Sequence, residues 1–248
     1  VNVTIPPTRH DILHECDIME DVGIAFGYNN IEWTFPNAQT VGQQLSLNKL
    51  SDQLRYEISR CGFTEALTFS LCSKEDIAKR MRDDASLEIA VTISNPKTID
   101  FEVARTSLIP GLLKTVHSNK KMPLPMKLFE ISDVVLKDKN TEVGARNERR
   151  LCALNYNKTP GFEVIHGLLD RIMQVLNICY SPEKNNNGYY IKSCQDNRFL
   201  LGRCAEIVVD ASVVGVMGVL HPEVIGNFEL TQPCAVLEIN VEKLTYKL

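Results

Sequence analysis

The 248-residue sequence lacks the features that mark several common classes of protein. No run approaches the roughly 20 apolar residues that a bilayer-spanning helix needs, and no signal peptide opens the chain. The net charge is −4, which gives no support for tight, nonspecific binding of nucleic acid through a broad basic surface. Internal repeats and low-complexity segments are absent. With 44% apolar and 23% charged residues, we expect an ordinary globular, cytoplasmic protein without membrane segments.

The eight cysteines form no C-x-x-C pair, and no histidine lies at zinc-finger spacing from such a pair. Most of them lie within apolar runs, as Cys152 does in the sequence Leu-Cys-Ala-Leu. Cysteines in such positions behave as small core residues. The pattern favours reduced thiols in a cytosolic protein.

A nucleophile motif is also missing. None of the histidines has a serine or cysteine partner in a recognisable catalytic pattern. His221 stands before a proline after a predicted strand, which is typical of the start of a helix. The five scattered histidines are His10, His14, His117, His166 and His221.

Hydrophobic periodicity predicts helices and strands of unequal length joined by tight turns. The clearest example is a helix with apolar residues at Leu108, Leu112 and Val116, capped by Ser107 and followed by a strand over Lys127–Leu136. Regular alternation of strand and helix, as in a doubly wound parallel sheet, is missing. The sequence therefore predicts an α+β fold, with an antiparallel sheet flanked by helices.

The same periodicities define the remaining predicted elements. One helix begins between Ile12 and Cys16 and ends near Phe26, and others cover Leu47–Cys61, Ser73–Met81, Phe162–Cys179 and Pro222–Phe228. Strands are predicted at Val1–Ile5, Phe63–Leu71, Ile89–Ile93, Leu151–Tyr156, Tyr189–Cys194, Ala205–Val209, Val213–Leu220 and Cys234–Asn240. A linker is predicted at Glu32–Gly42, a solvated charged loop at Lys137–Arg150, and a turn or loop at Pro182–Gly188.

Several long motifs, in order, resemble one family. They are R-T-S-L-I-P-G-L-L from Arg105, L-F-E-I-S-D-V-V from Leu128, N-P-K from Asn95, G-F-T-E-A-L-T-F from Gly62 and L-H-P-E-V from Leu220. They closely resemble the catalytic-like module of the β subunit of phenylalanyl-tRNA synthetase, of the eukaryotic cytosolic type. Residues 9–28 resemble the end of its B5 domain. The resemblance implies that residues 1–33 are the C-terminal end of a B5 domain, a strand-helix remnant, and that residues 41–248 form an inactive module with the class II aminoacyl-tRNA synthetase fold.

The residues with which class II enzymes hold ATP are missing. A triphosphate requires fixed planar cations, which motif 2 supplies as R-x-E and motif 3 as a final arginine. Here the motif 2 counterpart is Leu128-Phe129-Glu130, the motif 3 counterpart is Gly215–Leu220, and no arginine follows Arg203. The sequence therefore predicts that this chain forms no adenylate, and that its two motif 3 glycines serve close packing in a strand. For Arg105, pairing with a carboxylate near the helix start is favoured over ligand binding.

Four acids near the start of the chain form a candidate metal site. Asp11, Asp17, Glu20 and Asp21 supply the carboxylate oxygens that Mg²⁺ prefers. By resemblance, they match the B5 acids assigned to magnesium, with aspartate replacing the usual glutamate at Asp21. Alternatively, they are a solvated helix face that complements the N-terminal dipole. The sequence leaves both interpretations open.

The resemblance also implies a function and partners. It predicts a non-catalytic part of phenylalanine–tRNA ligase that packs against the catalytic α subunit in an α₂β₂ enzyme charging tRNA(Phe), with ATP and phenylalanine handled by α. Because Val1 is not a start methionine, we expect a piece of a longer polypeptide. The resemblance implies that it is the C-terminal part, without the editing domain, the rest of B5 or, since the chain ends soon after Leu244, an anticodon-binding domain of the bacterial type. The alternatives are a free-standing nucleic-acid-binding or interaction module and an independent enzyme. The deficit of positive over negative charge and the lack of paired stacking aromatics argue against the first, and the missing arginines argue against the second.

A partner requires a surface. Helices beside a sheet bury one apolar stripe internally, so a second stripe needs another protein to cover it. We expect such a surface on the helices Leu47–Ile58 and Arg105–Val116, with Ile109 and Leu113 in the second stripe.

Overall fold

The computed structural model describes residues 1–35, 42, 45–181 and 188–247. It divides into two compact units, Val1–Gln43 and Gln44–Leu248. Most of the linker predicted at Glu32–Gly42 and of the loop predicted at Pro182–Gly188 lies outside the described residues.

The first unit contains helix α1 (Glu15–Phe26), whose predicted position is confirmed. A capping box begins α1, because Asp17 accepts hydrogen bonds from backbone N–H groups ahead of the helix, including that of His14 at 2.9 Å. Gly27 ends it with φ of 90°, a backbone conformation that favours glycine. The strand predicted at Val1–Ile5 is wrong, because these residues belong to no strand of the described chain. No residue of α1 is buried within the unit.

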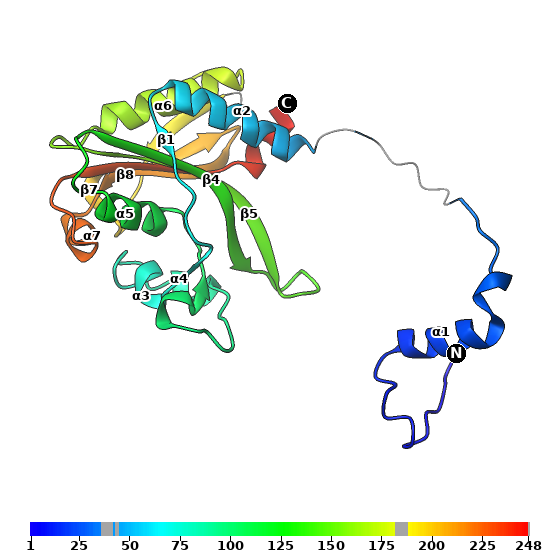
Figure 1. Ribbon diagram of the computed structural model, residues 1–248. Coiled ribbons are helices and arrows are strands. Elements are labelled where there is room, and N and C mark those ends of the chain that lie inside the picture. The colour runs from blue at the N-terminus through cyan, green and yellow to red at the C-terminus, as the bar shows by residue number, and fades with distance from the viewer. Residues whose placement is uncertain (36–41, 43–44, 182–187, 248) are drawn as a thin grey trace. The chain divides into compact units, whose positions relative to one another are not determined.

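The second unit is built on a seven-stranded sheet with the order β1-β4-β5-β9-β8-β7-β6 (Figure 1). Every described neighbouring pair is antiparallel except β1 with β4, which is parallel. A second, two-stranded sheet pairs β2 with β3. The predicted α+β fold is confirmed, and the sheet that was predicted to be antiparallel is mostly so. The strands are β1 (Thr64–Glu65), β2 (Leu71–Cys72), β3 (Val103–Ala104), β4 (Met126–Lys137), β5 (Ala145–Tyr156), β6 (Tyr189–Ser193), β7 (Phe199–Val209), β8 (Ser212–Leu220) and β9 (Cys234–Asn240).

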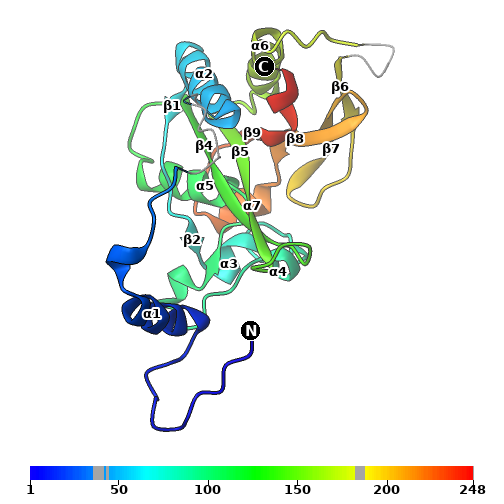
Figure 2. The same ribbon diagram turned by 90° about the vertical axis from the view of Figure 1, so that its right-hand side faces the viewer.

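Helices cover both faces of the large sheet. Helices α2 (Ser46–Arg60) and α6 (Phe162–Val175) lie together on one face, and α5 (Ile109–Ser118) and α7 (Pro222–Asn227) lie on the other (Figures 1 and 2). Strand β4 serves both layers, since Phe129 and Ile131 join the core under α2 and α6, whereas Val134 joins the core under α5 and α7. Two short helices, α3 (Lys74–Ile77) and α4 (Ser86–Ile89), lie in the segment between β2 and β3. Among the described residues, no helix has the length and apolar content to span a membrane.

Two predicted strands are wrong. The segment predicted as one strand over Phe63–Leu71 contains only β1 and β2, and the chain leaves the sheet between them. There Thr68 turns inward, because a buried carboxylate needs its hydrogen bonds, so that Leu67 and Phe69 are 81% and 79% exposed. The strand predicted at Ile89–Ile93 is replaced by the end of α4 and single-residue bridges of Ala90 and Thr92.

The loop predicted at Lys137–Arg150 is also wrong. Strands β4 and β5 form a long hairpin, so the connection covers only residues 138–144. The charged residues Arg149 and Arg150 fit into β5 because each reaches a carboxylate on a neighbouring strand. Charge density therefore indicated a loop where ion pairing allows a strand.

The prediction of a second apolar stripe at Ile109 and Leu113 is wrong. Ile109 and Leu113 are both fully buried within the unit, since α5 lies between the sheet and the segment that carries α3. On α2, Leu50, Leu54 and Ile58 are likewise buried against the sheet. A surface for a partner must be sought elsewhere.

Candidate functional site

One row of side chains crosses the sheet on the face covered by α5. Residues directly opposite in antiparallel strands share a face, and the register pairs Glu130 with Cys152, Cys152 with Glu238 and Glu238 with Val216. The next pairing adds Glu206. Glu130 is fully buried and Glu238 is 4% exposed, so this face of the large sheet contains two buried carboxylates. Buried carboxylates require charged or hydrogen-bonding partners, which define the site.

Arg105 and Thr68 satisfy Glu130. The Arg105 guanidinium donates to Glu130 Oε1 at 2.8 Å, and the Thr68 hydroxyl donates to Glu130 Oε2 at 2.7 Å. Arg105 also donates to the backbone carbonyls of Asp133 at 2.9 Å and Thr68 at 3.2 Å. This buried pair confirms the favoured interpretation of Arg105. The guanidinium therefore makes its hydrogen bonds within the chain.

Glu238 holds the start of α5. Its carboxylate accepts from the backbone N–H of Leu108 at 2.7 Å and from the Ser107 hydroxyl at 2.9 Å. Ser107 Oγ in turn accepts from the N–H of Ile109 at 3.2 Å. A negative charge at this end complements the helix dipole. The contacts that an anionic ligand would make at this helix start are therefore made by a side chain from the sheet.

A second ion-pair group lies on β5 between this row and the turn of the β4–β5 hairpin. Glu148 accepts from Arg150 at 2.8 Å and from Arg146 at 2.7 Å, and Arg150 also lies 3.4 Å from Glu238. Burial alone would raise the pKa of Glu148, but the two arginines outweigh it and lower that pKa below its ordinary value. Burial opposes the charge of Arg150 too, yet the two glutamates raise its pKa.

These groups line a polar cavity of about 510 Å³. The cations and carboxylates on its walls are equal in number and cancel one another. A triphosphate with several negative charges requires an excess of cations, which this cavity does not supply. The cations in the lining are Arg146, Arg150, Arg198 and Lys243, and the carboxylates are Glu148, Asp196, Glu206 and Glu238.

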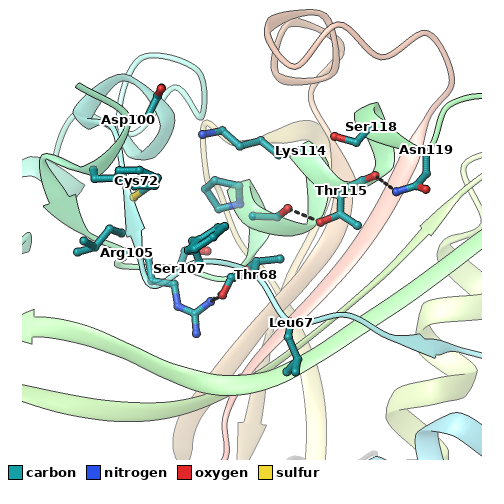
Figure 3. Close-up of a pocket in the computed structure, with 15 residues that line it drawn as sticks. Leu67, Thr68, Cys72, Asp100, Arg105, Ser107, Lys114, Thr115, Ser118 and Asn119 are labelled. Carbon is teal, nitrogen blue, oxygen red and sulfur yellow. Dashed lines mark hydrogen bonds between the residues drawn. The ribbon is translucent and has the colours of Figure 1, made fainter. Parts of the chain in front are cut away.

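A smaller and more apolar cavity, of about 340 Å³, lies between α5, β2 and the chain around Thr68 (Figure 3). Arg105 points its guanidinium toward Thr68, and Lys114 pairs with the buried carboxylate of Asp76. Burial raises the pKa of Cys72 to about 12, so this thiol is no nucleophile at neutral pH. The cavity offers neither a free cation for phosphate nor an activated nucleophile.

The two glycines of the motif 3 counterpart serve close packing, as predicted. A Cβ at Gly215 would lie 2.3 Å from the carbonyl oxygen of Glu238, and one at Gly218 would lie 2.5 Å from that of Arg203. The segment Gly215–Leu220 is thus part of a central strand and no phosphate cradle. His221 is the cap of α7, as expected, with Nδ1 accepting from the N–H of Glu223 at 3.1 Å.

Among the described residues, three of the four predicted magnesium ligands, all but Glu20, have other partners in the first unit. Arg9 bridges Asp11 and Asp21 at 2.8 Å each, and Asp17 caps α1. Within the described part of the chain, no group of three or more His, Cys, Asp or Glu side chains has metal-binding geometry. These side chains as arranged therefore do not fit Mg²⁺, which would have to displace Arg9. Magnesium binding at Asp11, Asp17, Glu20 and Asp21 stays a prediction.

Comparison with known proteins decides the family. A family model described as the phenylalanyl tRNA synthetase beta chain CLM domain matches residues 31–241, and one for the tRNA synthetase B5 domain matches residues 1–28. The chain belongs to the phenylalanyl-tRNA synthetase β chains. Among curated members of this β-chain family, the phenylalanine–tRNA ligase β subunit of Homo sapiens is 59% identical over 97% of this chain. That of Drosophila melanogaster is 55% identical over 97%, and the cytoplasmic one of Arabidopsis thaliana is 47% identical over 98%.

The chain spans 41% of the length of each of these β-chain relatives. A solved pyrrolysyl tRNA synthetase from Desulfitobacterium hafniense shares the fold, with a TM-score of 0.66 at 14% identity over 83% of this chain and 67% of that one. This likeness shows that this β-chain family member shares the fold of that tRNA synthetase over most of its length.

Sequence reasoning found Arg105 but missed the carboxylates that organise the site. Glu238 is the single charge in the apolar run Ala-Val-Leu-Glu-Ile of β9, and Glu130 is the single charge in the short run Leu-Phe-Glu-Ile of β4. A single charge in such a run is the signal that a buried partner exists. Which partner it meets follows only from the strand register.

Proposed function

We propose that this chain is the non-catalytic part of a phenylalanine–tRNA ligase β subunit, and that it supports assembly of the α₂β₂ enzyme. The observation that carries the proposal is that the two buried carboxylates of the large sheet have their partners within the chain itself. Glu130 and Glu238 take up the Arg105 guanidinium and the start of α5, so no arginine there is free to hold ATP. ATP, phenylalanine and the adenylate are then handled by the α subunit, in the cytoplasm, with tRNA(Phe) as the acceptor.

The α subunit requires a contact surface, which we place at Leu67 and Phe69. Both side chains are largely exposed, although they flank Thr68, which is held by Glu130 and Arg105. Phe69 stacks only at a tilt on Phe101, with ring centroids 5.8 Å apart. Apolar side chains held in solvent by a rigid anchor are typical of a docking surface. This surface replaces the stripe that the sequence predicted on α5.

For the first unit, we propose that Mg²⁺ binds Asp11, Asp17, Glu20 and Asp21 in the assembled enzyme. Carboxylate oxygens suit this ion, and its binding there requires Arg9 to leave Asp11 and Asp21. The B5 match of residues 1–28 supports the assignment.

Two measurements test the central proposal. Phenylalanine-dependent ATP–pyrophosphate exchange should be absent from a preparation of the chain without α, and measurable exchange would refute the non-catalytic role. Co-expression with α should yield much less complex for Leu67→Asp or Phe69→Ser than for the wild type. Leu201→Asp is the matched control, because Leu201 is 83% exposed on β7 and should leave the yield unchanged. Equal yields for all three variants would exclude this surface.

A further inference from the structure

Cys194 and Cys204 face each other across two strands. The last registered pair of β6 and β7 is Ser193 with Ala205, and one step further Cys194 donates its N–H to the carbonyl of Cys204 at 3.2 Å. Their sulfur atoms are 2.8 Å apart. No sequence pattern indicated this pair, since the two cysteines are separated by a turn and an irregular stretch of β7.

The strand geometry by itself is suited to a covalent bond. Directly opposite residues in antiparallel strands have Cα atoms about 4.5–5.5 Å apart and side chains on the same face. Disulfides span Cα distances of about 4.4–6.8 Å. A bond between these sulfurs therefore needs a small side-chain adjustment and no movement of the strands.

The two thiols differ in accessibility. Cys194 is partly exposed and lies at the border between the 510 Å³ cavity and a neighbouring cavity of about 210 Å³. Cys204 is 6% exposed, and its burial, together with the contact to Cys194, raises its pKa well above the ordinary value. A reagent from solution therefore reaches Cys194 more readily than Cys204, although Cys204 also lines the smaller cavity.

We propose that Cys194 and Cys204 form a reversible disulfide by exchange with a low-molecular-weight disulfide such as glutathione disulfide. The Cys194 thiolate attacks one sulfur of glutathione disulfide, forms a mixed disulfide and releases one glutathione. Cys204 loses its proton to solvent, attacks the sulfur of Cys194 and displaces the second glutathione. Two cysteine thiols are oxidised and one glutathione disulfide is reduced to two glutathione thiols.

The bond would close a ring around a segment that forms the wall of both cavities. Arg198 pairs with Asp196 at 2.6 Å, and its carbonyl accepts from the N–H of His221 at 2.9 Å. Arg82 donates to the carbonyl of Asn197 at 2.8 Å. These contacts already hold the segment in place. The cross-link therefore preserves the folded geometry and restricts the unfolded chain, which should raise the melting temperature.

The test equilibrates the intact protein, in the assembly from which it is purified, with glutathione disulfide. Free thiols are then blocked with N-ethylmaleimide, and the peptides are mapped without reduction. We expect a dominant cross-linked peptide containing Cys194 and Cys204, its loss after dithiothreitol, and a higher melting temperature for the oxidised form. Cys204→Ser should instead accumulate glutathione on Cys194. Cys179→Ser, at an exposed cysteine, is the control and should cross-link like the wild type.

Two results would overturn the proposal. One is a wild type that stops at glutathionylated Cys194 with the Cys204 thiol still free. The other is a cross-link that forms only after the protein is denatured. Both are read from the wild type, so they do not depend on how well the serine variants fold.

Discussion

Replacing the buried Glu130 by glutamine should destabilise the second unit more than replacing an exposed charge at its surface by a neutral isostere. The substitution keeps the shape of the side chain and lets it still accept a hydrogen bond from the Thr68 hydroxyl. It removes the charge that compensates Arg105, 2.8 Å away. The side chain of Arg105 is 7% exposed and that of Glu130 is fully buried, so water cannot take over this role.

The size of the effect follows from the desolvation of an unpaired charge. Removing one partner of a buried ion pair costs roughly 3–5 kcal/mol. Arg105 keeps its hydrogen bonds to the carbonyls of Thr68 and Asp133, which places the expected loss at the lower end, about 3 kcal/mol. Since folded domains are stable by only about 5–15 kcal/mol, this loss should be large in any unfolding experiment.

Urea unfolding followed by far-UV circular dichroism measures the change. Glu142→Gln is the matched control, because Glu142 is exposed in the 138–144 connection and its substitution should change the free energy of unfolding by less than about 0.5 kcal/mol. If the free energy of unfolding of Glu130→Gln lies within about 1 kcal/mol of the wild-type value, Arg105 does not need the charge of Glu130. That result would refute the view that the buried carboxylates of the sheet are required to compensate this arginine.

Three further outcomes follow from other contacts. Gly218→Ala should cost roughly 1–3 kcal/mol, because its Cβ would meet a backbone carbonyl of the neighbouring strand at 2.5 Å, whereas Gly167→Ala, in open space on α6, should stabilise by roughly 0.5–1 kcal/mol; equal signs in thermal unfolding would contradict the packing argument. The lowered pKa of Glu148 contributes stability that is present above its unfolded value of 4.5 and lost as the pH falls through the lower folded value, so Glu148→Gln should flatten the acid limb of a stability–pH profile. Arg9→Ala should strengthen Mn²⁺ binding several-fold in a paramagnetic titration and Asp21→Asn should weaken it, and identical titrations would mean that these acids are a solvated face.

The elements that local sequence could predict are those with a regular apolar period. Helices α2, α5 and α6 follow directly from such spacing, because one stripe must face the sheet whatever the rest of the chain does. Strand β9 follows from a short apolar run for the same reason. The absence of arginines from the motif 2 and motif 3 counterparts likewise required only the sequence, since a missing side chain cannot be supplied by folding.

Tertiary structure decided every feature that depends on a partner far along the chain. Whether the segment around Arg149 is a loop or a strand depended on the carboxylates that strand pairing brings to it. Leu67 and Phe69 are exposed because the Thr68 side chain faces inward to hydrogen-bond Glu130. The alternating pattern of Phe63–Leu71 does not indicate this hydrogen bond. Glu130 and Glu238 share one row only through the register of β4, β5 and β9. A buried charge accepts whichever opposite charge the register places beside it, so local sequence can reveal that a partner exists and only the fold can select it.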